Sequence, residues 1–167
     1  STLSSSSAAS DVYKRQILGS FRLVEEKKMI EDLFREINTN TGKGSYGLQE
    51  VIEFLKNNVV KTLLITDNTN LHRVEAECKR CKHIQEDIVE RPLVIPKKTE
   101  YKNNPCPDCK SMDIEVNEQD IVDYLQIIAA KTGSQLEVIS GSAEHGNMLA
   151  SLGKIGAILR YNPGHSK

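Results

Sequence analysis

Residues 48–66, LQEVIEFLKNNVVKTLLIT, decide the fold class. The first part carries apolar residues at the spacing of one helix face: Leu48, Val51, Ile52 and Leu55. The second part, VVKTLLIT at 59–66, is β-branched and almost continuously apolar, which is typical of a strand covered on both faces. An amphipathic helix that leads into a buried strand predicts an α/β fold.

The chain before this stretch contains a second amphipathic helix. Its apolar positions recur at i, i+3, i+4 and i+7: Ile30, Leu33, Phe34 and Ile37. The pattern predicts a helix over about residues 22–38. Residues 1–16 are serine-rich and show no helical period, so we expect residues 1–20 to be a disordered leader or linker.

A loop is predicted between the two helices, at residues 38–47 (NTNTGKGSYG), which is dense in turn-forming residues. Its Gly42-Lys43-Gly44-Ser45 is similar to part of a phosphate-binding loop. However, the glycine five residues before the Gly-Lys-Ser is missing, and a helix precedes the loop where a strand is needed. The pattern therefore argues against nucleotide binding here.

The last third of the chain continues the alternation of helices and strands. Asn117, with Asp120 three residues on, predicts the capped start of a helix that ends at Gly133. Strands are expected at 135–140 (QLEVIS) and 155–161 (IGAILRY). Between them, Ser142 is the expected N-cap of a short helix closed by Gly153. The whole pattern predicts a three-layer α/β/α sandwich.

All four cysteines of the chain lie in two C-x2-C pairs that are separated by 24 residues: Cys78, Cys81, Cys106 and Cys109. Two residues between cysteines let both sulfurs of a pair turn toward one point, and two pairs supply four thiolates for a tetrahedral Zn²⁺ site. A site with four protein ligands leaves no position for a reactive water. The spacing therefore predicts a structural zinc site and argues against a zinc hydrolase.

Other chemistry is conceivable for these cysteines. Two disulfides would suit a small secreted domain, but no secretion signal is visible. A redox C-x-x-C needs only one pair. The spacing alone does not exclude an iron–sulfur cluster. Four thiolates around Zn²⁺ leave a charge of about −2, which the basic neighbours can offset: Lys79, Arg80, Lys82 and Lys110. His83 is expected to lie beside the site without binding the metal.

The cysteines divide the chain into predicted parts. A possible strand at 71–77 leads out to a zinc-ribbon-like insertion, residues 78–111, in which 84–95 would form a short hairpin. Residues 112–116 would return the chain to the main body. The predicted organisation is a leader at 1–20, a main domain at 21–77 and 112–162, the insertion, and a tail at 163–167.

Composition limits the classes of function. A hydrophobic fraction of 38% supports an apolar core, and 22 basic against 23 acidic residues give a net charge of −1. A dedicated nucleic-acid or membrane-surface binder would show a basic excess. No apolar run approaches the roughly 20 residues that cross a bilayer. Cysteines arranged for a metal suit a reducing cytoplasm, so a cytoplasmic location is expected.

Three separated segments carry a resemblance to a known family. They are SYGLQEVIEFLKNNVVKTLLITD (45–67), the two cysteine pairs, and EHGNMLASLGKIGAILRY (144–161). Together they resemble the C-terminal domain of the archaeal class-1 peptide chain release factor, a family that also includes eukaryotic release factors and Pelota. The four cysteines favour the archaeal branch, whose members keep a zinc-binding minidomain at this point.

The resemblance implies a role in translation termination. Family members read the stop codon and promote peptidyl-tRNA hydrolysis through two other domains, one of them carrying a Gly-Gly-Gln loop that this sequence lacks. The third domain docks partners: the translational GTPase (in archaea the elongation factor that carries aminoacyl-tRNA), the ABC-class recycling ATPase, and the ribosome. The chain itself is therefore expected not to be an enzyme.

The resemblance also implies a contact surface for the GTPase at the final strand. The matching residues here are Gly156, Ala157, Ile158, Leu159, Arg160 and Tyr161. Lys154 stands where the family commonly has glycine, so this surface departs from the family pattern in detail. The alternative is an RNA-binding module with a structural zinc, because the sandwich also resembles ribosomal proteins. The near-zero charge and the 5% aromatic content argue against that alternative.

Overall fold

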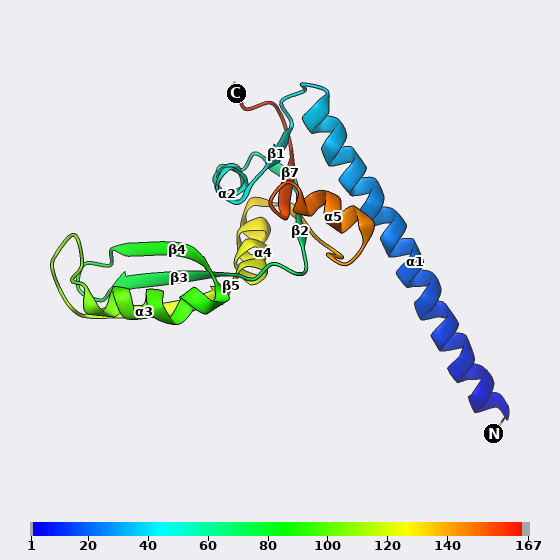
Figure 1. The fold of residues 1–167 in the computed structure, drawn as a ribbon, viewed down its shortest axis with the longest axis horizontal. Coiled ribbons are helices and arrows are strands. Elements are labelled where there is room, and N and C mark those ends of the chain that lie inside the picture. Colours follow the sequence, from blue (N-terminus) through cyan, green and yellow to red (C-terminus); the bar gives the residue numbers. More distant parts are fainter. Residues whose placement is uncertain (1, 165–167) are drawn as a thin grey trace. The chain divides into compact units, whose positions relative to one another are not determined.

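The computed structural model describes residues 2–164, with side chains from residue 19 on. Contacts divide the chain into two units (Figure 1). The first contains Ser1–Asp67 and Ser134–Lys167, and the second contains Asn68–Gly133. No helix in the described part of the chain is both long and apolar enough to span a membrane.

The first unit is built on a four-stranded sheet. Its strands are β1 (Gly44–Tyr46), β2 (Val60–Thr66), β6 (Gln135–Ile139) and β7 (Ile155–Leu159), in the order β1-β7-β2-β6. β2 and β6 are parallel, whereas β7 runs antiparallel to both β1 and β2. The near-continuous apolar sequence of β2 follows from its inner position, because Leu63, Leu64 and Ile65 are all buried.

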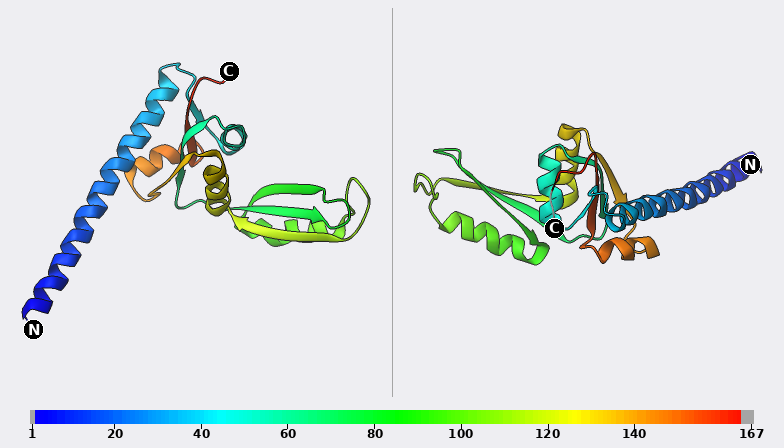
Figure 2. Two further views of the ribbon diagram at one scale, coloured as in Figure 1. Left: turned by 180° about the vertical axis from the view of Figure 1, so that it is seen from behind. Right: turned by 90° about the horizontal axis from the view of Figure 1, so that it is seen from above.

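Helices cover both faces of this sheet. On one face lie α1 (Thr2–Asn38) and α5 (Glu144–Ala150), and on the other lies α2 (Leu48–Lys56) (Figure 2). The core under α1 and α5 is aliphatic and fully buried: Ile30, Leu33, Leu64, Ile139 and Leu149. The predicted three-layer α/β/α arrangement is confirmed.

Gly156 allows α1 to lie close to the sheet. A β-carbon added at this glycine would lie 2.5 Å from Cδ2 of Leu33, which is too close for two carbon atoms. Because Gly156 has no side chain, Leu33 packs directly over the backbone of β7.

The second unit is a three-stranded antiparallel sheet with two helices. Its strands are β3 (Leu71–Cys78), β4 (Ile84–Glu90) and β5 (Ile114–Asp120), in the order β4-β3-β5. A 3-10 turn, η1 (Arg91–Leu93), leads into α3 (Val94–Asn103), which packs on β3 and β5. After β5 comes α4 (Ile121–Thr132), whose Tyr124 ring lies 4.6 Å from the guanidinium of Arg73.

The structure differs from the sequence-based predictions at the N-terminal side. Residues 2–20, expected to be disordered, continue α1, which therefore begins at Thr2. Within the expected loop at 38–47, residues Gly44–Tyr46 form β1, because they pair with β7 in register. Residues 165–167 of the predicted tail lie outside the described part of the chain.

The second unit also differs from the predicted insertion. It is wider than residues 78–111, because β5 pairs with β3 and does not return to the main sheet. The expected hairpin at 84–95 ends at Glu90, and a helix follows it. The helix expected to be capped by Asn117 is capped by Asp120, whose Oδ1 accepts a hydrogen bond from Val122 N at 2.8 Å.

Candidate metal centre

The two cysteine pairs form two turns with the same backbone hydrogen bonds. In the first turn, Cys78 N donates to His83 O and Lys82 N donates to Cys78 O, each at 2.9 Å. In the second, Cys106 N donates to Ser111 O at 2.8 Å and Lys110 N to Cys106 O at 2.9 Å. Each turn places a lysine four residues after its first cysteine in the left-handed region, with φ of 66° and 65°. The two turns are thus structural repeats.

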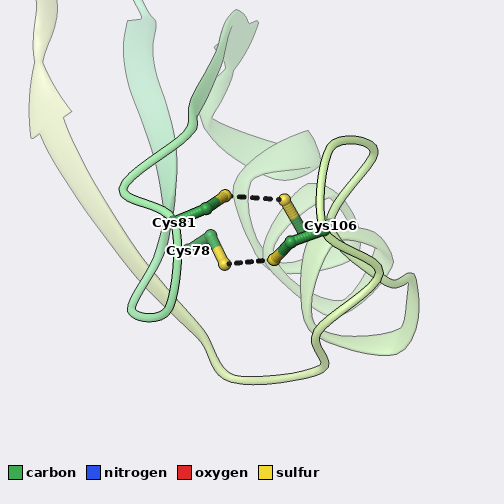
Figure 3. A group of neighbouring side chains, drawn as sticks. Cys78, Cys81 and Cys106 are labelled. Atoms are coloured by element: carbon green, nitrogen blue, oxygen red, sulfur yellow. Dashed lines mark hydrogen bonds between the residues drawn. The ribbon is translucent and has the colours of Figure 1, made fainter.

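These turns bring all four sulfurs together. The Sγ atoms lie within 4.8 Å of one another (Figure 3). The shortest separations are across the turns, 3.4 Å between Cys78 and Cys109 and 3.5 Å between Cys81 and Cys106. Tetrahedral coordination with Zn–S bonds of about 2.3 Å requires sulfurs about 3.8 Å apart. The cluster therefore fits a four-coordinate metal ion with little adjustment.

Each half of the cluster is held by a different kind of element. Cys78 is the last residue of β3 and is 1% exposed, and Cys106 is fully buried in the loop after α3. Cys81 is exposed and Cys109 is half-buried. The second unit thus buries one cysteine of each pair.

Hydrogen bonds to sulfur prepare the cluster for a cation. The backbone N–H of Cys81, helped by that of Arg80, lowers the pKa of Cys78 to about 6, although burial opposes this. The pKa of Cys81 is raised to about 12: the N–H of His83 lowers it, but partial desolvation and the neighbouring sulfurs outweigh that effect. Without a metal, one thiolate is favoured and the charging of its neighbour is opposed. A bound cation removes this conflict, and its uptake releases protons.

The basic residues around the cluster have different partners. Lys79 forms ion pairs with Glu115 and, at 3.1 Å, with Glu77, and these contacts raise its pKa. The charge of Lys79 is therefore shared between these carboxylates and the nearby sulfurs. His83 contributes no ligand atom to the cluster. Its Nδ1 lies 2.9 Å from Oδ2 of Asp108, so this contact joins the first cysteine turn to the second.

The predicted partner surface on the final strand is only partly accessible. Gly156 and Leu159 are buried in β7, and Ile158 is half-buried. Arg160 and Tyr161, which follow the strand, are exposed, Tyr161 to 53%. Arg160 is anchored, because its Nε donates to Val60 O at 3.0 Å. The accessible part of this surface is therefore the Arg160-Tyr161 pair.

The structure also shows a buried polar cluster that sequence analysis missed. Glu26 of α1 is 2% exposed, and its Oε1 accepts from Ser140 N at 2.9 Å and lies 3.0 Å from Nε2 of His145. Its Oε2 accepts from Arg22 Nε at 3.2 Å. His145, in the first turn of α5, is also buried, at 7% exposure. The sequence offers no signal for this pairing, because 119 residues separate the two partners.

Comparison with known proteins identifies the family of this chain. The family model described as eRF1 domain 3 matches residues 23–163, which is most of the chain. The chain therefore belongs to this family, the third domain of class-1 peptide chain release factors, and the resemblance found in the sequence is confirmed.

Individual relatives are archaeal. The chain is 31% identical over 147 residues to peptide chain release factor subunit 1 of Methanocaldococcus jannaschii and 34% identical to that of Thermococcus onnurineus. Each alignment covers 87% of this chain and 35% of the relative, so the chain spans about a third of their length.

Solved structures agree. The C-terminal domain of the Methanosarcina mazei peptide chain release factor superposes with a TM-score of 0.81 at 29% identity, covering 95% of this chain and 97% of that one. Archaeoglobus fulgidus Pelota has a similar fold, with a TM-score of 0.55 at 24% identity over 93% of this chain and 36% of that one.

Proposed function

We propose that this chain is the partner-docking domain of an archaeal release factor that acts in translation termination in the cytoplasm. The family assignment supports this role, and the four-sulfur cluster supports the archaeal branch. The proposed partners are the translational GTPase, which in archaea is the elongation factor that carries aminoacyl-tRNA, the ABC-class recycling ATPase, and the ribosome.

The metal proposed for the cluster is Zn²⁺ in a structural role. Four thiolates at these separations match its tetrahedral preference, and a closed set of four ligands leaves no site for an activated water. The residues proposed to hold it are Cys78, Cys81, Cys106 and Cys109. Accordingly, we propose that the chain performs no reaction itself and shows no peptidyl-tRNA hydrolysis on stop-programmed ribosomes.

The proposed GTPase contact is the end of β7. The observation that carries this proposal is the exposure of Arg160 and Tyr161 immediately after a strand whose own residues are buried or half-buried. An exposed tyrosine beside an arginine is the composition typical of protein-binding hot spots.

A pull-down against the archaeal elongation GTPase, loaded with a non-hydrolysable GTP analogue, tests the docking role. Arg160→Glu and Tyr161→Ala should each weaken capture, by about tenfold or more for residues of hot-spot type. Lys28→Glu, a similar charge reversal at an exposed position of α1, is the matched control and should bind normally. Unchanged capture by the first two variants would remove the end of β7 as the contact. Failure of the unmodified chain to bind would reject the GTPase as partner.

A further inference from the structure

The four cysteines form two close contacts that each join one cysteine turn to the other. Cys81 of the first turn lies 3.5 Å from Cys106 of the second, and Cys109 of the second lies 3.4 Å from Cys78 of the first, measured between sulfurs (Figure 3). We call these two contacts the cross-turn pairs. A disulfide bond is about 2.0 Å long, so a small side-chain movement would bring either pair to bonding distance.

Each cross-turn pair combines an accessible cysteine with a buried one. Cys81 is exposed and its partner Cys106 is fully buried. In the other pair, Cys109 is half-buried and its partner Cys78 is 1% exposed. An oxidant from solvent can therefore reach one sulfur of each pair, and the neighbour that can trap the oxidised sulfur lies beside it.

The surroundings of Cys81 are typical of a reactive cysteine. Cysteines that react with oxidants are accessible thiolates near basic residues, and they often have a second cysteine beside them. Cys81 is exposed and is followed and preceded by exposed basic residues, Lys82 and Arg80. Cysteines bind a metal as thiolates, so metal binding holds Cys81 in the form that attacks an oxidant.

We propose that Cys81 is a site of reversible oxidation by hydroperoxides, and that oxidation replaces the metal with two cross-turn disulfides, Cys81–Cys106 and Cys78–Cys109. The competing products are disulfides within the turns, Cys78–Cys81 and Cys106–Cys109, which would leave the two turns unlinked. The inference goes beyond the proposed function and does not depend on docking at the end of β7.

The chemistry balances with hydrogen peroxide as the oxidant. The Cys81 thiolate attacks one peroxide oxygen: a sulfur–oxygen bond forms, the oxygen–oxygen bond breaks, hydroxide leaves, and Cys81 becomes a sulfenic acid. The Cys106 thiolate then attacks the Cys81 sulfur: the disulfide forms, the sulfur–oxygen bond breaks, and a second hydroxide leaves. A second peroxide oxidises Cys109, which Cys78 traps in the same way. Four thiolates and two peroxides thus give two disulfides and four hydroxides, and the disulfide sulfurs no longer bind the ion.

The cross-turn disulfides would keep the turns joined but change their charge. The two bonds link residues 25 and 31 positions apart, and such cross-links stabilise a fold by restricting the unfolded chain. Four thiolates with Zn²⁺ carry a charge of about −2, whereas two disulfides carry none. Oxidation therefore removes the negative charge that the exposed Arg80, Lys82 and Lys110 offset, and the isoelectric point of the chain should rise.

Peptide mapping of the oxidised chain tests the pairing. The zinc-loaded chain is treated with two equivalents of hydrogen peroxide, and free thiols are then blocked. Trypsin cuts at the basic residues between Cys78 and Cys81, and Asp-N protease cuts before Asp108, between Cys106 and Cys109. Mass spectrometry of the unreduced digest should find Cys81 joined to Cys106 and Cys78 joined to Cys109. Disulfides within the turns, or Cys78 joined to Cys106, would overturn the proposal.

Zinc release and sulfenic-acid trapping test the order of events. A metal-sensitive dye should detect one zinc ion released for every two peroxides consumed. Dimedone, which couples to sulfenic acids, should label Cys81 when it is added with the peroxide and should leave Cys106 unlabelled. Zinc that stays bound while peroxide is consumed, or equal labelling of the two cysteines, would reject Cys81 as the site of oxidation.

Hydrogen exchange tests whether the disulfides take the place of the metal. Amides of β3 and β5 should stay protected after oxidation, and dithiothreitol with Zn²⁺ should restore the original protein. The control is the reduced chain stripped of metal by a chelator, which should lose protection at the cysteine turns. Equal loss of protection in the oxidised and the stripped chains would overturn the proposal. A chain purified without zinc would reject the proposed metal, while the disulfide map would still decide the oxidation.

Discussion

The two units each hold a sheet and its helices together, but they are stabilised by different interactions. In the first, a fully buried aliphatic cluster from α1, β2, β6 and α5 lies under the helices. In the second, α4 buries Ile121 and Leu125, but α3 and the sheet bury little beyond Val74, Ala76 and Val94, and the buried residues at the far end of β3 are cysteines. The first unit thus depends on the hydrophobic effect, whereas the cysteine end of the second unit depends on its four-sulfur cluster.

Replacing one cysteine should have the largest effect, and the resulting unfolding should be confined to the second unit. A structural zinc supplies about 10–16 kcal/mol of apparent binding free energy at pH 7. Cys106→Ser should therefore unfold the cysteine turns and β4 and abolish stoichiometric zinc, while the first unit keeps its hydrogen-exchange protection. Pro107→Ala, which keeps all four sulfurs, is the control. Loss of protection throughout the chain would show that the two units do not fold separately.

A cavity in the aliphatic core should have the converse effect. Leu64 is fully buried in β2, and Leu64→Ala should cost about 2–5 kcal/mol of unfolding free energy, because the lost contacts leave a cavity. Denaturant unfolding followed at probes in the first unit measures this loss. Zinc content should stay at the value of the unmodified chain. A variant that lost zinc together with stability would contradict the comparison.

The buried Glu26 should make a smaller and pH-dependent contribution. Burial by itself raises the pKa of Glu26, but hydrogen bonds from Ser140, His145 and Arg22 outweigh it and hold the pKa below 4.5. The stability that Glu26 contributes is therefore complete above pH 4.5 and is lost as the pH falls through the lowered value. Glu26→Gln should cost about 1–3 kcal/mol at pH 7.

The measurement for Glu26 is the unfolding free energy of both proteins from pH 7 to pH 3. The gap between the unmodified chain and Glu26→Gln should narrow at acid pH. Glu25→Gln, one position along an exposed part of α1, should show no such gap. A gap that stays constant with pH would mean that the carboxylate charge is not what stabilises the contact.

The smallest effect is expected at the two left-handed lysines. Lys82 and Lys110 have positive φ, a conformation that costs a residue with a side chain roughly 1–2 kcal/mol relative to glycine. Lys82→Gly and Lys110→Gly should each stabilise the zinc-loaded turns by less than about 1 kcal/mol, because glycine loses more backbone entropy on folding. Competition with a zinc chelator measures the change. Opposite signs for the two variants would show that the two turns are not equivalent.

Local patterns predicted much of this molecule. The apolar stripe of α2 and the β-branched run of β2 could be predicted because their residues are the buried ones. Gly133 ends α4 with φ of 70°, as expected for a left-handed cap. The C-x2-C spacing predicted the sulfur cluster, because the turn that brings two sulfurs together is formed by neighbouring residues.

The missed features depend on distant partners or on exceptions to local rules. β1 is three residues long and exists because β7 lies beside it. α3 was missed because Pro96 breaks helices in their interior, yet here it falls in the first turn, where its missing N–H has no intrahelical partner. The pairing of β5 with β3 and the contact between Glu26 and His145 are set only by the tertiary fold.

The parallel pairing of β2 and β6 has a consequence for how the chain folds. Roughly seventy residues, the entire second unit among them, separate the end of β2 at Thr66 from the start of β6 at Gln135. Closing so long a loop is slow when it is flexible, and it becomes easier when the intervening chain is already ordered. We therefore expect zinc to accelerate refolding of the sandwich, although its proposed site lies in the other unit. Stopped-flow refolding with and without zinc would reveal equal rates if this is wrong.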